Sequence, residues 1–394
     1  MSADPTLRSA SGFAADPGRR LFGLDLLRAV AILMVVYIHG GYLIETIVPY
    51  SLYIWPTVDG VSLFFVLSGY LIGRILIRSF VEVPADMRSL THFWIRRWFR
   101  TLPNYYLVLT ILVVQVLVSG SVLPRDWPLY YVFGQNLFSV HPDFFPEAWS
   151  LAIEEWFYLL VPMLLLVILK AVPSAEQRAR RFLLAIFAII IAVTVARTIV
   201  VFSGDVADYG SWDSLVRKRV FTRLDAIAIG VLGAYASLYC KDFWFRSRIP
   251  GAVTGLILVV VDRYFFMTND FYGAFVSLTV LPVATLLLLP MLTSMRASRG
   301  AGPWLIGWIS RLSYSMYLVN LTLVQGVLMP MLFGPTAEAS PPLLRYFVYW
   351  AMTIGISWAL YRFWEFPMMN LRDRFPEPVV HDTPGSAQPG ARER

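Results

Sequence analysis

Ten hydrophobic stretches, separated by short polar connections, run along most of the chain. A bilayer core of about 30 Å is crossed by roughly 20 helical residues, and each stretch is close to that length. Continuous apolar runs of this size are typical of transmembrane helices. The pattern therefore predicts an all-α, multi-pass transmembrane bundle of about ten helices. The stretches lie near residues 24–44, 60–78, 101–120, 148–170, 182–202, 223–240, 250–267, 272–294, 303–326 and 343–364.

Arginine and lysine residues concentrate in alternate connections. The connection at residues 45–59 contains none, whereas the N-terminal segment and the even-numbered connections are basic. Because basic residues are retained on the cytoplasmic side during membrane insertion, this alternation places both chain termini in the cytoplasm. The basic connections are residues 79–100, 170–181, 241–248 and 296–299.

One connection departs from the alternation. Residues 203–222 are predicted to lie outside, yet they contain Arg217, Lys218 and Arg219. Two explanations remain open: nearby acidic residues and strong flanking helices override the bias, or the basic residues bind an anionic or polar acceptor molecule. The acidic residues of this connection are Asp205, Asp208 and Asp213.

The composition agrees with a membrane protein and gives no support for nucleic-acid binding or for an internal disulfide. Hydrophobic residues make up 57% of the chain and charged residues 15%, with a mean hydropathy of +0.62, far from the composition of soluble proteins. The net charge of +7 comes mostly from residues that the membrane topology explains, and we find no nucleic-acid motif. The single Cys240 excludes an internal disulfide. The first apolar stretch lacks a convincing cleavage site, so we interpret it as a retained helix.

A single membrane domain at residues 21–367 is the simplest division of the chain, since we see no internal repeat and no appended soluble domain. The flanking segments, residues 1–20 and 368–394, are polar and rich in Pro, Gly, Ala and Ser. Such segments bury too little apolar surface to order themselves, so we expect two disordered cytoplasmic tails.

The first helix carries three ionisable residues, Asp25, Arg28 and His39. At 100° per residue, the eleven positions from Arg28 to His39 return nearly to the same face, about 16 Å further along the axis. Charged residues within membrane helices are costly and usually face the protein interior. We therefore expect one polar stripe that faces the bundle or a water-filled cavity. Alternatively, His39 only forms a hydrogen bond with a neighbouring helix.

Other polar residues are placed near both ends of the bundle. Ser62, at the outer end of the second helix, has a depth comparable with that of His39. Arg96, Arg97 and Arg100 cluster at the cytoplasmic start of the third helix, before Pro103. They act either as anchors to lipid head groups or as a guanidinium cluster that binds phosphate.

The fourth helix contains adjacent carboxylates, Glu154 and Glu155, inside an apolar run. Their side chains project about 100° apart, so at least one faces protein. Such a carboxylate can orient His39, hold acceptor hydroxyls or pair with an arginine such as Arg223. The sixth helix adds a row of small residues at spacings of four, which predicts close helix packing. This row is Ala226, Gly230 and Ala234.

These segments, in this order, resemble the integral-membrane O-acyltransferases called acyltransferase family 3. The resemblance covers most of the chain, from Leu24 to Pro367, and rests on the order of several individually weak motifs. The matching pieces are Arg28 with His39, "FFVLSGYLI" at 64–72, "RRWFRTLP" at 96–103, "WSLAIEEWFY" at 149–158, "RLDAIAIG" at 223–230, "LSYSMYL" at 312–318 and "WEFP" at 364–367.

The resemblance implies transfer of an acyl group, usually acetyl from cytoplasmic acetyl-CoA, to a hydroxyl of a carbohydrate-containing acceptor. The protein is then expected in the inner cell membrane. A surface polysaccharide or lipid-linked glycan is the expected acceptor, and a small glycosylated metabolite such as a macrolide is the alternative. His39 is then the general base, or forms an acyl-histidine, assisted by Glu154 and Ser62. The residues expected to bind CoA are Arg28, Arg96, Arg97 and Arg100. Those expected to bind the substrate are Trp149, Glu155, Tyr158, Arg223 and Asn320. The candidate oxyanion donors are Ser62, Trp149, Tyr158 and Asn320.

Two positions depart from the family pattern. Many relatives have Asp in place of Ser62, although Asp59 lies one turn earlier, and many have His in place of Asn320. No metal site is indicated, because the histidines are scattered without ligand spacing. A transporter or flippase, and a non-catalytic membrane scaffold, are the competing functions; the first predicts paired halves or broken helices that we do not see. The histidines are His39, His92, His141 and His381.

Overall fold

The computed structural model describes residues 21–203, 206, 208–269, 271–297, 300–334 and 340–372. All regular elements in these ranges are helical, which confirms the predicted all-α bundle. Most of the two expected tails, and Asp205, lie outside the described residues. Residues 366–372 form a helix, so helical structure continues past the position at which the C-terminal tail was expected to start.

Nine helices of the described part are long and apolar enough to cross a membrane, and the shorter α8 is also apolar. The chain is therefore a multi-pass membrane protein. Ten crossings would return the chain to the side on which it began, as the charge pattern predicts. The crossing helices are α1 (Phe22–Gly40), α3 (Gly60–Leu76), α4 (Met87–Val118), α5 (Ala148–Leu169), α6 (Ala175–Phe202), α8 (Leu224–Tyr239), α10 (Arg248–Thr268), α11 (Ser277–Ser294), α12 (Ala301–Val319) and α14 (Pro342–Leu360).

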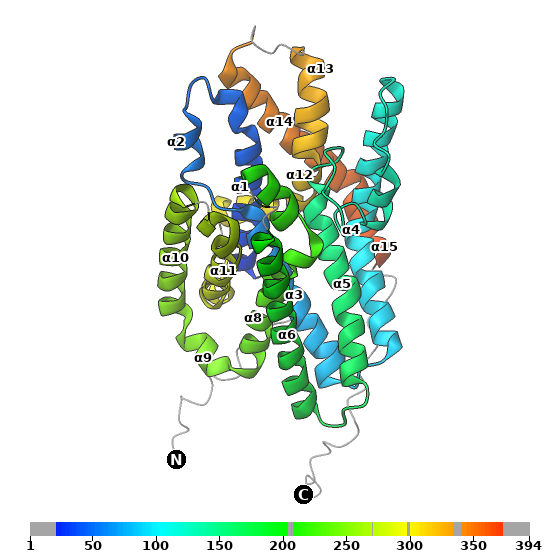
Figure 1. Ribbon diagram of the computed structural model, residues 1–394, viewed down its shortest axis with the longest axis vertical. Helices are drawn as coiled ribbons and strands as arrows, with labels where there is room; N and C mark the ends of the chain where they lie inside the picture. The colour runs from blue at the N-terminus through cyan, green and yellow to red at the C-terminus, as the bar shows by residue number, and fades with distance from the viewer. Residues whose placement is uncertain are drawn as a thin grey trace, which may run out of the picture.

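Shorter helical pieces extend or connect these helices. In Figure 1, α2 and α13 lie at one end of the molecule, which we call the outer end, and α9 lies at the opposite, inner end. The extensions are η2 (Gly41–Ile44), η3 (Ile77–Glu82), η7 (Tyr272–Val276), η8 (Asn320–Leu328), α13 (Met329–Phe333), η10 (Tyr361–Glu365) and α15 (Phe366–Arg372). The connecting pieces are α2 (Tyr50–Ile54), η4 (Trp127–Val132), α7 (Tyr209–Trp212), η5 (Asp213–Arg217), η6 (Val220–Thr222) and α9 (Lys241–Arg246).

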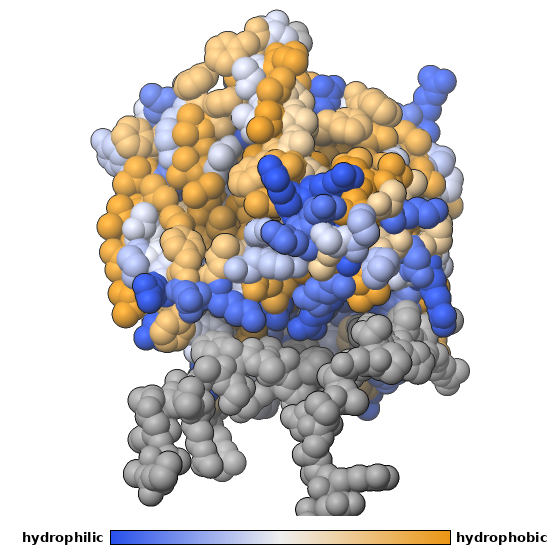
Figure 2. Space-filling model, turned by 90° about the horizontal axis from the view of Figure 1, so that it is seen from below, coloured by the Kyte–Doolittle hydropathy of each residue, from blue (hydrophilic) through white to orange (hydrophobic). Residues whose placement is uncertain are grey.

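Hydrophobic side chains cover much of the outer surface of the bundle. Viewed from the inner end, hydrophobic residues form most of the sides of the outline, while hydrophilic residues gather across the middle of the face (Figure 2). This distribution suits a bundle whose sides contact lipid and whose ends contact water.

The third crossing helix, α4, begins earlier than predicted. We expected a connection over residues 79–100, but η3 continues the preceding helix to Glu82 and α4 already starts at Met87. The Asp86 carboxylate accepts a hydrogen bond from the backbone N–H of Ser89 at 2.7 Å and caps this start. The predicted arginine cluster therefore lies along helical turns, on a rigid element.

The predicted small-residue row is a close contact between α3 and α8. A Cβ atom added to Gly230 would lie 2.1 Å from the carbonyl oxygen of Val66. A Cβ atom added to Gly69 would lie 1.9 Å from the carbonyl oxygen of Ile227. The structure thus confirms the predicted packing, which brings the middle of α3 against the middle of α8.

Candidate active site

A cavity of about 210 Å³ lies where the outer ends of several helices meet. Its wall includes the last turns of α1, the first turns of α3, α5 and α11, and part of η5. The polar and charged residues that line it are His39, Thr57, Asp59, Ser62, Glu147, Tyr209, Arg217, Lys218, Arg263, Ser277 and Tyr317.

His39 enters this cavity from α1, and its Nδ1 atom lies 2.5 Å from Oδ1 of Asn320. The Asn320 amide nitrogen donates to the carbonyl oxygens of Met316 at 2.9 Å and Tyr317 at 2.8 Å. These two acceptors fix which end of the amide is nitrogen, so Oδ1 faces the imidazole. Nδ1 of His39 must then carry the proton, which leaves Nε2 as the basic nitrogen.

The polar stripe of α1 faces α12 and its continuation. Ser310 of α12 donates to the Asp25 carboxylate at 2.6 Å, and Arg28 contacts both Asp25 and Ser310 at 3.3 Å. Asn320, ten residues after Ser310 and at the start of η8, contacts His39. The prediction that Arg28 and His39 share a face toward the bundle is confirmed.

Ser62 belongs to a buried hydrogen-bonded chain in the cavity wall. It accepts from Arg223 Nη2 at 2.7 Å and donates to Asp59 Oδ2 at 2.7 Å. Arg223 also donates to the carbonyl of Leu278 at 3.0 Å. Arg223, which the sequence offered as one possible partner for Glu154 or Glu155, thus has other partners. Its guanidinium instead organises the first turn of α3, and the Ser62 hydroxyl proton is already used within the wall.

Glu147, which was not among the residues predicted from the sequence, lies directly before α5 and lines the cavity. Its two carboxylate oxygens accept from the backbone N–H of Thr322 at 3.0 Å and from the hydroxyl of Thr322 at 2.5 Å. Burial raises the pKa of Glu147 to about 7, against the opposing effect of these hydrogen bonds. Glu147 thereby holds the π-helical turn on which Asn320 lies.

The outer connection contributes a basic wall. Asp213 Oδ1 lies 2.6 Å from Nε of Arg217, and Asp213 Oδ2 lies 2.5 Å from Nζ of Lys218. Burial alone would raise the pKa of Asp213, but these two cations outweigh burial and lower it below its ordinary value. The Arg217 guanidinium also stacks over the ring of Trp149 at 4.8 Å.

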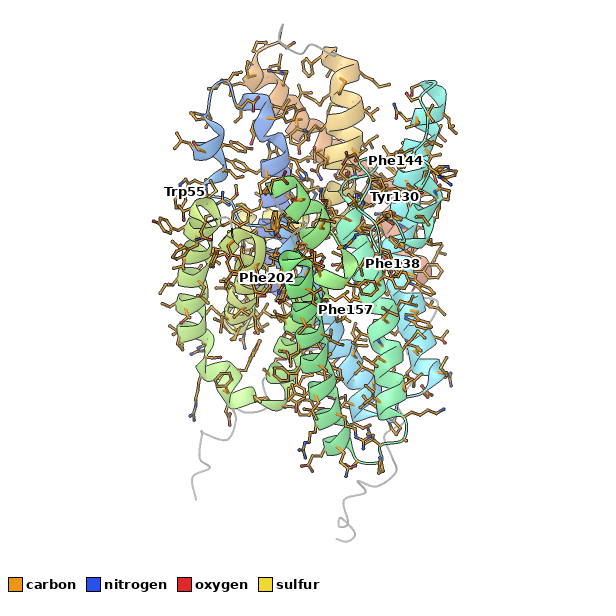
Figure 3. All side chains as sticks on the ribbon, viewed as in Figure 1. Trp55, Tyr130, Phe138, Phe144, Phe157 and Phe202 are labelled. Carbon is orange, nitrogen blue, oxygen red and sulfur yellow. The ribbon has the colours of Figure 1, made fainter. Side chains whose placement is uncertain are left out.

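A connecting segment closes the cavity beside α10. Trp55 lies next to the outer end of α10 in Figure 3. Arg263 donates to the carbonyl of Trp55 at 3.1 Å and to that of Ile54 at 2.6 Å. Because Ile54 and Thr57 line the cavity, Arg263 holds this segment in place over it.

Glu154 and Tyr158 belong to a separate polar cluster around Arg97. Arg97 Nη2 lies 2.5 Å from the Tyr158 hydroxyl, 3.3 Å from Glu154 Oε2 and 3.5 Å from the Ser68 hydroxyl. Ser68 follows Ser62 by six residues on α3, about 9 Å along the axis. The structure therefore does not bring Glu154 or Tyr158 to His39, and Glu154 pairs with Arg97.

Two aromatic residues of α3 stand between Ser62 and Ser68 along the chain. Phe65, between Ser62 and Ser68 on α3, packs edge-on against Trp149 with ring centroids 6.0 Å apart. Phe64 packs in the same way against Tyr317 at 6.4 Å. The cavity at His39 is lined by none of the arginines expected to bind CoA, which are Arg28, Arg96, Arg97 and Arg100.

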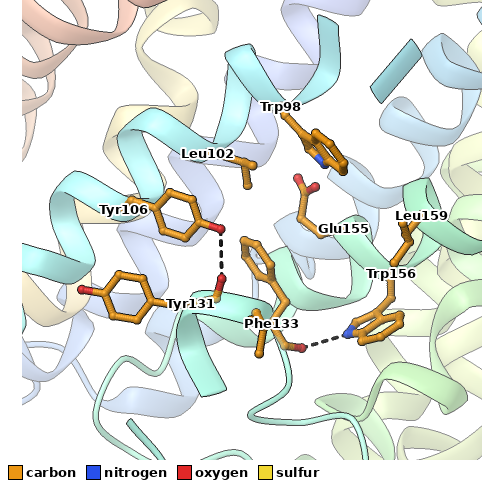
Figure 4. A pocket seen from close by; sticks show the side chains of 9 residues that line it. Trp98, Leu102, Tyr106, Tyr131, Phe133, Glu155, Trp156 and Leu159 are labelled. Atoms are coloured by element: carbon orange, nitrogen blue, oxygen red, sulfur yellow. Dashed lines mark hydrogen bonds between the residues drawn. The ribbon is translucent and has the colours of Figure 1, made fainter. Parts of the chain in front are cut away.

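Glu155 lines a different cavity, of about 300 Å³, between α4, α5 and η4 (Figure 4). It accepts a hydrogen bond from Thr101 at 2.9 Å among mostly aromatic side chains. Tyr106 and Trp156 fix this wall by donating to the carbonyls of Tyr131 and Phe133, each at 2.9 Å. Glu155 is thus separated from the residues around His39.

The expected oxyanion donors are also distributed differently than predicted. Asn320 uses its amide protons on two carbonyls and serves His39 as an acceptor. Tyr158 lies in the Arg97 cluster, and the Ser62 hydroxyl donates to Asp59. Trp149 lines the cavity and stays a candidate. Within the described residues, no group of three His, Cys, Asp or Glu side chains has the arrangement of a metal site.

Comparison with known proteins identifies a family. The sequence model of the acyltransferase domain matches residues 21–362. A Staphylococcus aureus protein named "Putative O-acetyltransferase" is 26% identical over 384 residues, which cover 89% of this chain and 57% of that protein. The peptidoglycan O-acetyltransferase OatA of Listeria monocytogenes is 31% identical over 176 residues, which cover 39% of this chain and 25% of OatA. The chain thus spans little more than half the length of the Staphylococcus relative. No solved structure matches the chain significantly.

Proposed function

Because the chain belongs to the acyltransferase family, whose domain matches residues 21–362, we propose that it is a membrane O-acetyltransferase. In this proposal the protein lies in the inner cell membrane, the donor is cytoplasmic acetyl-CoA, and the acceptor is a hydroxyl of a surface polysaccharide or lipid-linked glycan. Two relatives named as O-acetyltransferases support the activity. The observation that carries the proposal is the imidazole of His39, which lines a polar cavity with Nδ1 bound to Asn320.

The chemistry follows from this arrangement. Nε2 of His39 removes the proton of an acceptor hydroxyl while the hydroxyl oxygen attacks the thioester carbon of acetyl-CoA. The tetrahedral intermediate collapses as the carbon–sulfur bond breaks, and the imidazolium returns the proton to the departing CoA thiolate. The products are the acetyl ester and CoA with a free thiol. Asn320 stabilises the imidazolium by accepting its Nδ1 proton in a hydrogen bond throughout.

The donor has to reach His39 from the inner end. In this proposal Arg97 and Arg100, on one face of α4, hold CoA phosphates through charge-assisted hydrogen bonds. The pantetheine arm, which is long and thin, then passes the level of Phe65 and Trp149. In this proposal the edge-on contact of Phe65 with Trp149 opens when the donor binds.

Two other functions fit less well. A small glycosylated metabolite is the second acceptor candidate within the same chemistry, but a cavity of about 210 Å³ would admit only its sugar. A transporter or flippase would need no base of fixed tautomer beside the cavity, so the His39 and Asn320 pair argues against it.

The test uses the purified chain in lipid nanodiscs with radiolabelled acetyl-CoA. A panel of polysaccharide fragments, a lipid-linked glycan and a macrolide serves as acceptors. We expect CoA release together with a mass gain of one acetyl group on one acceptor class. A well-folded sample that consumes no acyl-CoA with any acceptor would overturn the proposal.

A further inference from the structure

The basic wall of the cavity carries more positive charge than its own carboxylate offsets. Arg217 and Lys218 share the single carboxylate of Asp213, through contacts of 2.6 and 2.5 Å. One carboxylate neutralises one of two cations, so this wall keeps one positive charge next to the cavity. Because Coulomb interactions are stronger away from bulk water, that charge favours an anion inside the cavity.

The other carboxylates that line the cavity are already engaged. Asp59 accepts from Ser62 at 2.7 Å and lies 3.8 Å from the guanidinium of Arg223. Glu147 accepts twice from Thr322, and its pKa of about 7 leaves it partly protonated at neutral pH. Asp59 lies close enough to Arg217 to favour its charged form. Neither Asp59 nor Glu147 forms a direct ion pair with Arg217 or Lys218 among the contacts of the described residues.

Arg217 and Lys218 remain reachable from the cavity. Both side chains line the cavity, and each is 21% exposed. The Arg217 guanidinium lies over two indole rings, 4.8 Å from Trp149 and 6.0 Å from Trp212. A planar guanidinium fixed in this way can form paired hydrogen bonds with a carboxylate or phosphate, while Lys218 supplies a point charge beside it.

The surrounding rings suit a sugar. Trp149, Trp212, Tyr209 and Tyr317 all line the same cavity. Aromatic rings offer large rigid apolar faces with polar edges, and the C–H face of a pyranose ring can pack on them while its hydroxyls reach polar groups. A sugar placed here would have His39 on one side and the basic wall on the other.

The same observation explains the unusual charge of the outer connection. Positive residues are normally depleted on the outer side, yet this connection keeps Arg217, Lys218 and Arg219. Arg219 donates to the carbonyl of Phe138 at 3.2 Å and does not line the cavity. Two of the three basic residues therefore face the cavity, and the third provides a matched control.

We propose that the acceptor is an anionic sugar, whose carboxylate or phosphate binds Arg217 and Lys218 while its hydroxyl reaches His39. This inference rests on the proposed function and adds the substrate class. Binding of the anion positions the sugar, and the transfer chemistry is unchanged.

The binding experiment is independent of catalysis. Isothermal titration calorimetry measures the binding of glucuronic acid, its methyl ester and glucose 6-phosphate to the full chain in nanodiscs. We expect the acid or the phosphate to bind at least about tenfold more tightly than the ester, as for a charge-assisted hydrogen bond. The acid and phosphate arms distinguish the two sources of negative charge. Equal binding of acid, ester and phosphate would overturn the inference.

Variants separate the role of the charge from that of the fold. Lys218→Gln should reduce the preference for the anion about tenfold, and Lys218→Arg should retain most of it. Arg219→Gln, which removes the same charge from the same connection, should leave the preference unchanged. A loss with Arg219→Gln equal to that with Lys218→Gln would also overturn the inference, because general surface charge would then explain it.

Acetyl transfer to the same acceptors distinguishes the two proposals. If a neutral acceptor is acetylated as efficiently as the anionic one, the inference fails while the proposed function stands. If the anion binds in a Lys218-dependent way but no acceptor ever gains an acetyl group, the anion site stands while the proposed function fails.

Discussion

Replacement of Asn320 by leucine tests the arrangement of the catalytic base. In the wild type, Oδ1 of Asn320 lies 2.5 Å from Nδ1 of His39, and both amide protons go to the carbonyls of Met316 and Tyr317. Leucine has a similar shape but can accept no hydrogen bond. In Asn320→Leu, the Nδ1 proton of His39 therefore loses its acceptor, and the imidazole is free to adopt the other tautomer.

The size of the effect follows from the cost of an unpaired buried donor. Leaving such a donor without a partner costs about 1 to 3 kcal/mol. Only the Nδ1–H tautomer has a free Nε2 that can take the proton of the substrate hydroxyl. The free-energy cost of keeping this tautomer therefore adds to the activation barrier. At 1.36 kcal/mol per factor of ten, we expect kcat to fall about 5- to 150-fold. The KM for acetyl-CoA should change little, because Asn320 lies away from the arginines of α4.

The assay is steady-state acetyl transfer by the variant in nanodiscs, together with ¹⁵N NMR of the four histidines, whose ring nitrogen shifts report the tautomer. Asn104→Leu is the matched control. Asn104 is also a buried asparagine, but it donates to Glu365 at 2.8 Å, away from His39. If Asn320→Leu is folded and keeps the wild-type kcat, or loses no more than Asn104→Leu, the tautomer argument is refuted.

Three further predictions concern packing, pH and the donor. Gly69→Ala should destabilise the bundle by about 3 kcal/mol, because the new Cβ would overlap the carbonyl of Ile227, whereas Gly355→Ala, with no atom within 4 Å, should be neutral or slightly stabilising; thermal unfolding in detergent measures both. Burial raises the pKa of Glu147 from 4.5 to about 7, so the folded state binds more protons than the unfolded state in this window, and wild-type stability should fall as pH rises through it. Glu147→Gln should remove this pH dependence, whose total change in unfolding free energy is on the order of 3 kcal/mol. Unfolding experiments from pH 4 to 8 in which the variant keeps the wild-type pH dependence would contradict this prediction. Arg100→Gln should raise the KM for acetyl-CoA about tenfold, with a smaller effect on the KM for acetyl-dephospho-CoA. If the wild type and the variant have the same KM for acetyl-CoA, Arg100 does not bind a phosphate of the donor.

The helices and their inward faces could be predicted because they depend on local patterns. The apolar runs locate the crossing helices, and the eleven-residue spacing places Arg28 and His39 on one face. The small residues at spacings of four identify the α3 and α8 contact, since close packing needs side chains of that size. The family resemblance, carried by the order of several motifs, agrees with the domain match.

The partners of individual charges could not be predicted, because they depend on how helices rotate against one another. Glu154 pairs with Arg97 at 3.3 Å, and Arg223 binds Ser62 at 2.7 Å, although sequence alone offered Arg223 as a partner for Glu154. Adjacent Glu154 and Glu155 point into different surroundings, one toward Arg97 and the other into the aromatic cavity of Figure 4. Spacing shows that their directions differ but not what each direction meets.

Local irregularity hid two further features. Glu147 stands one residue before the apolar run of α5, where a carboxylate is ordinary at a helix start, so its contact with Thr322 could not be inferred. The helix also widens into a π-helical segment at Asn320. Hydrophobic periodicity does not reveal this change, yet it directs the Asn320 side chain to His39. π-Helical segments are frequent at functional sites.

The most direct test of the account is the rate of acetyl transfer by His39→Gln, measured in nanodiscs with labelled acetyl-CoA and the best acceptor for the wild type. Removal of a general base should lower kcat by at least about 100-fold, while binding of acetyl-CoA, measured separately, stays near the wild-type value. A folded His39→Gln protein that transfers acetyl groups within a few fold of the wild-type rate would contradict the account, because its only proposed proton acceptor would then be dispensable.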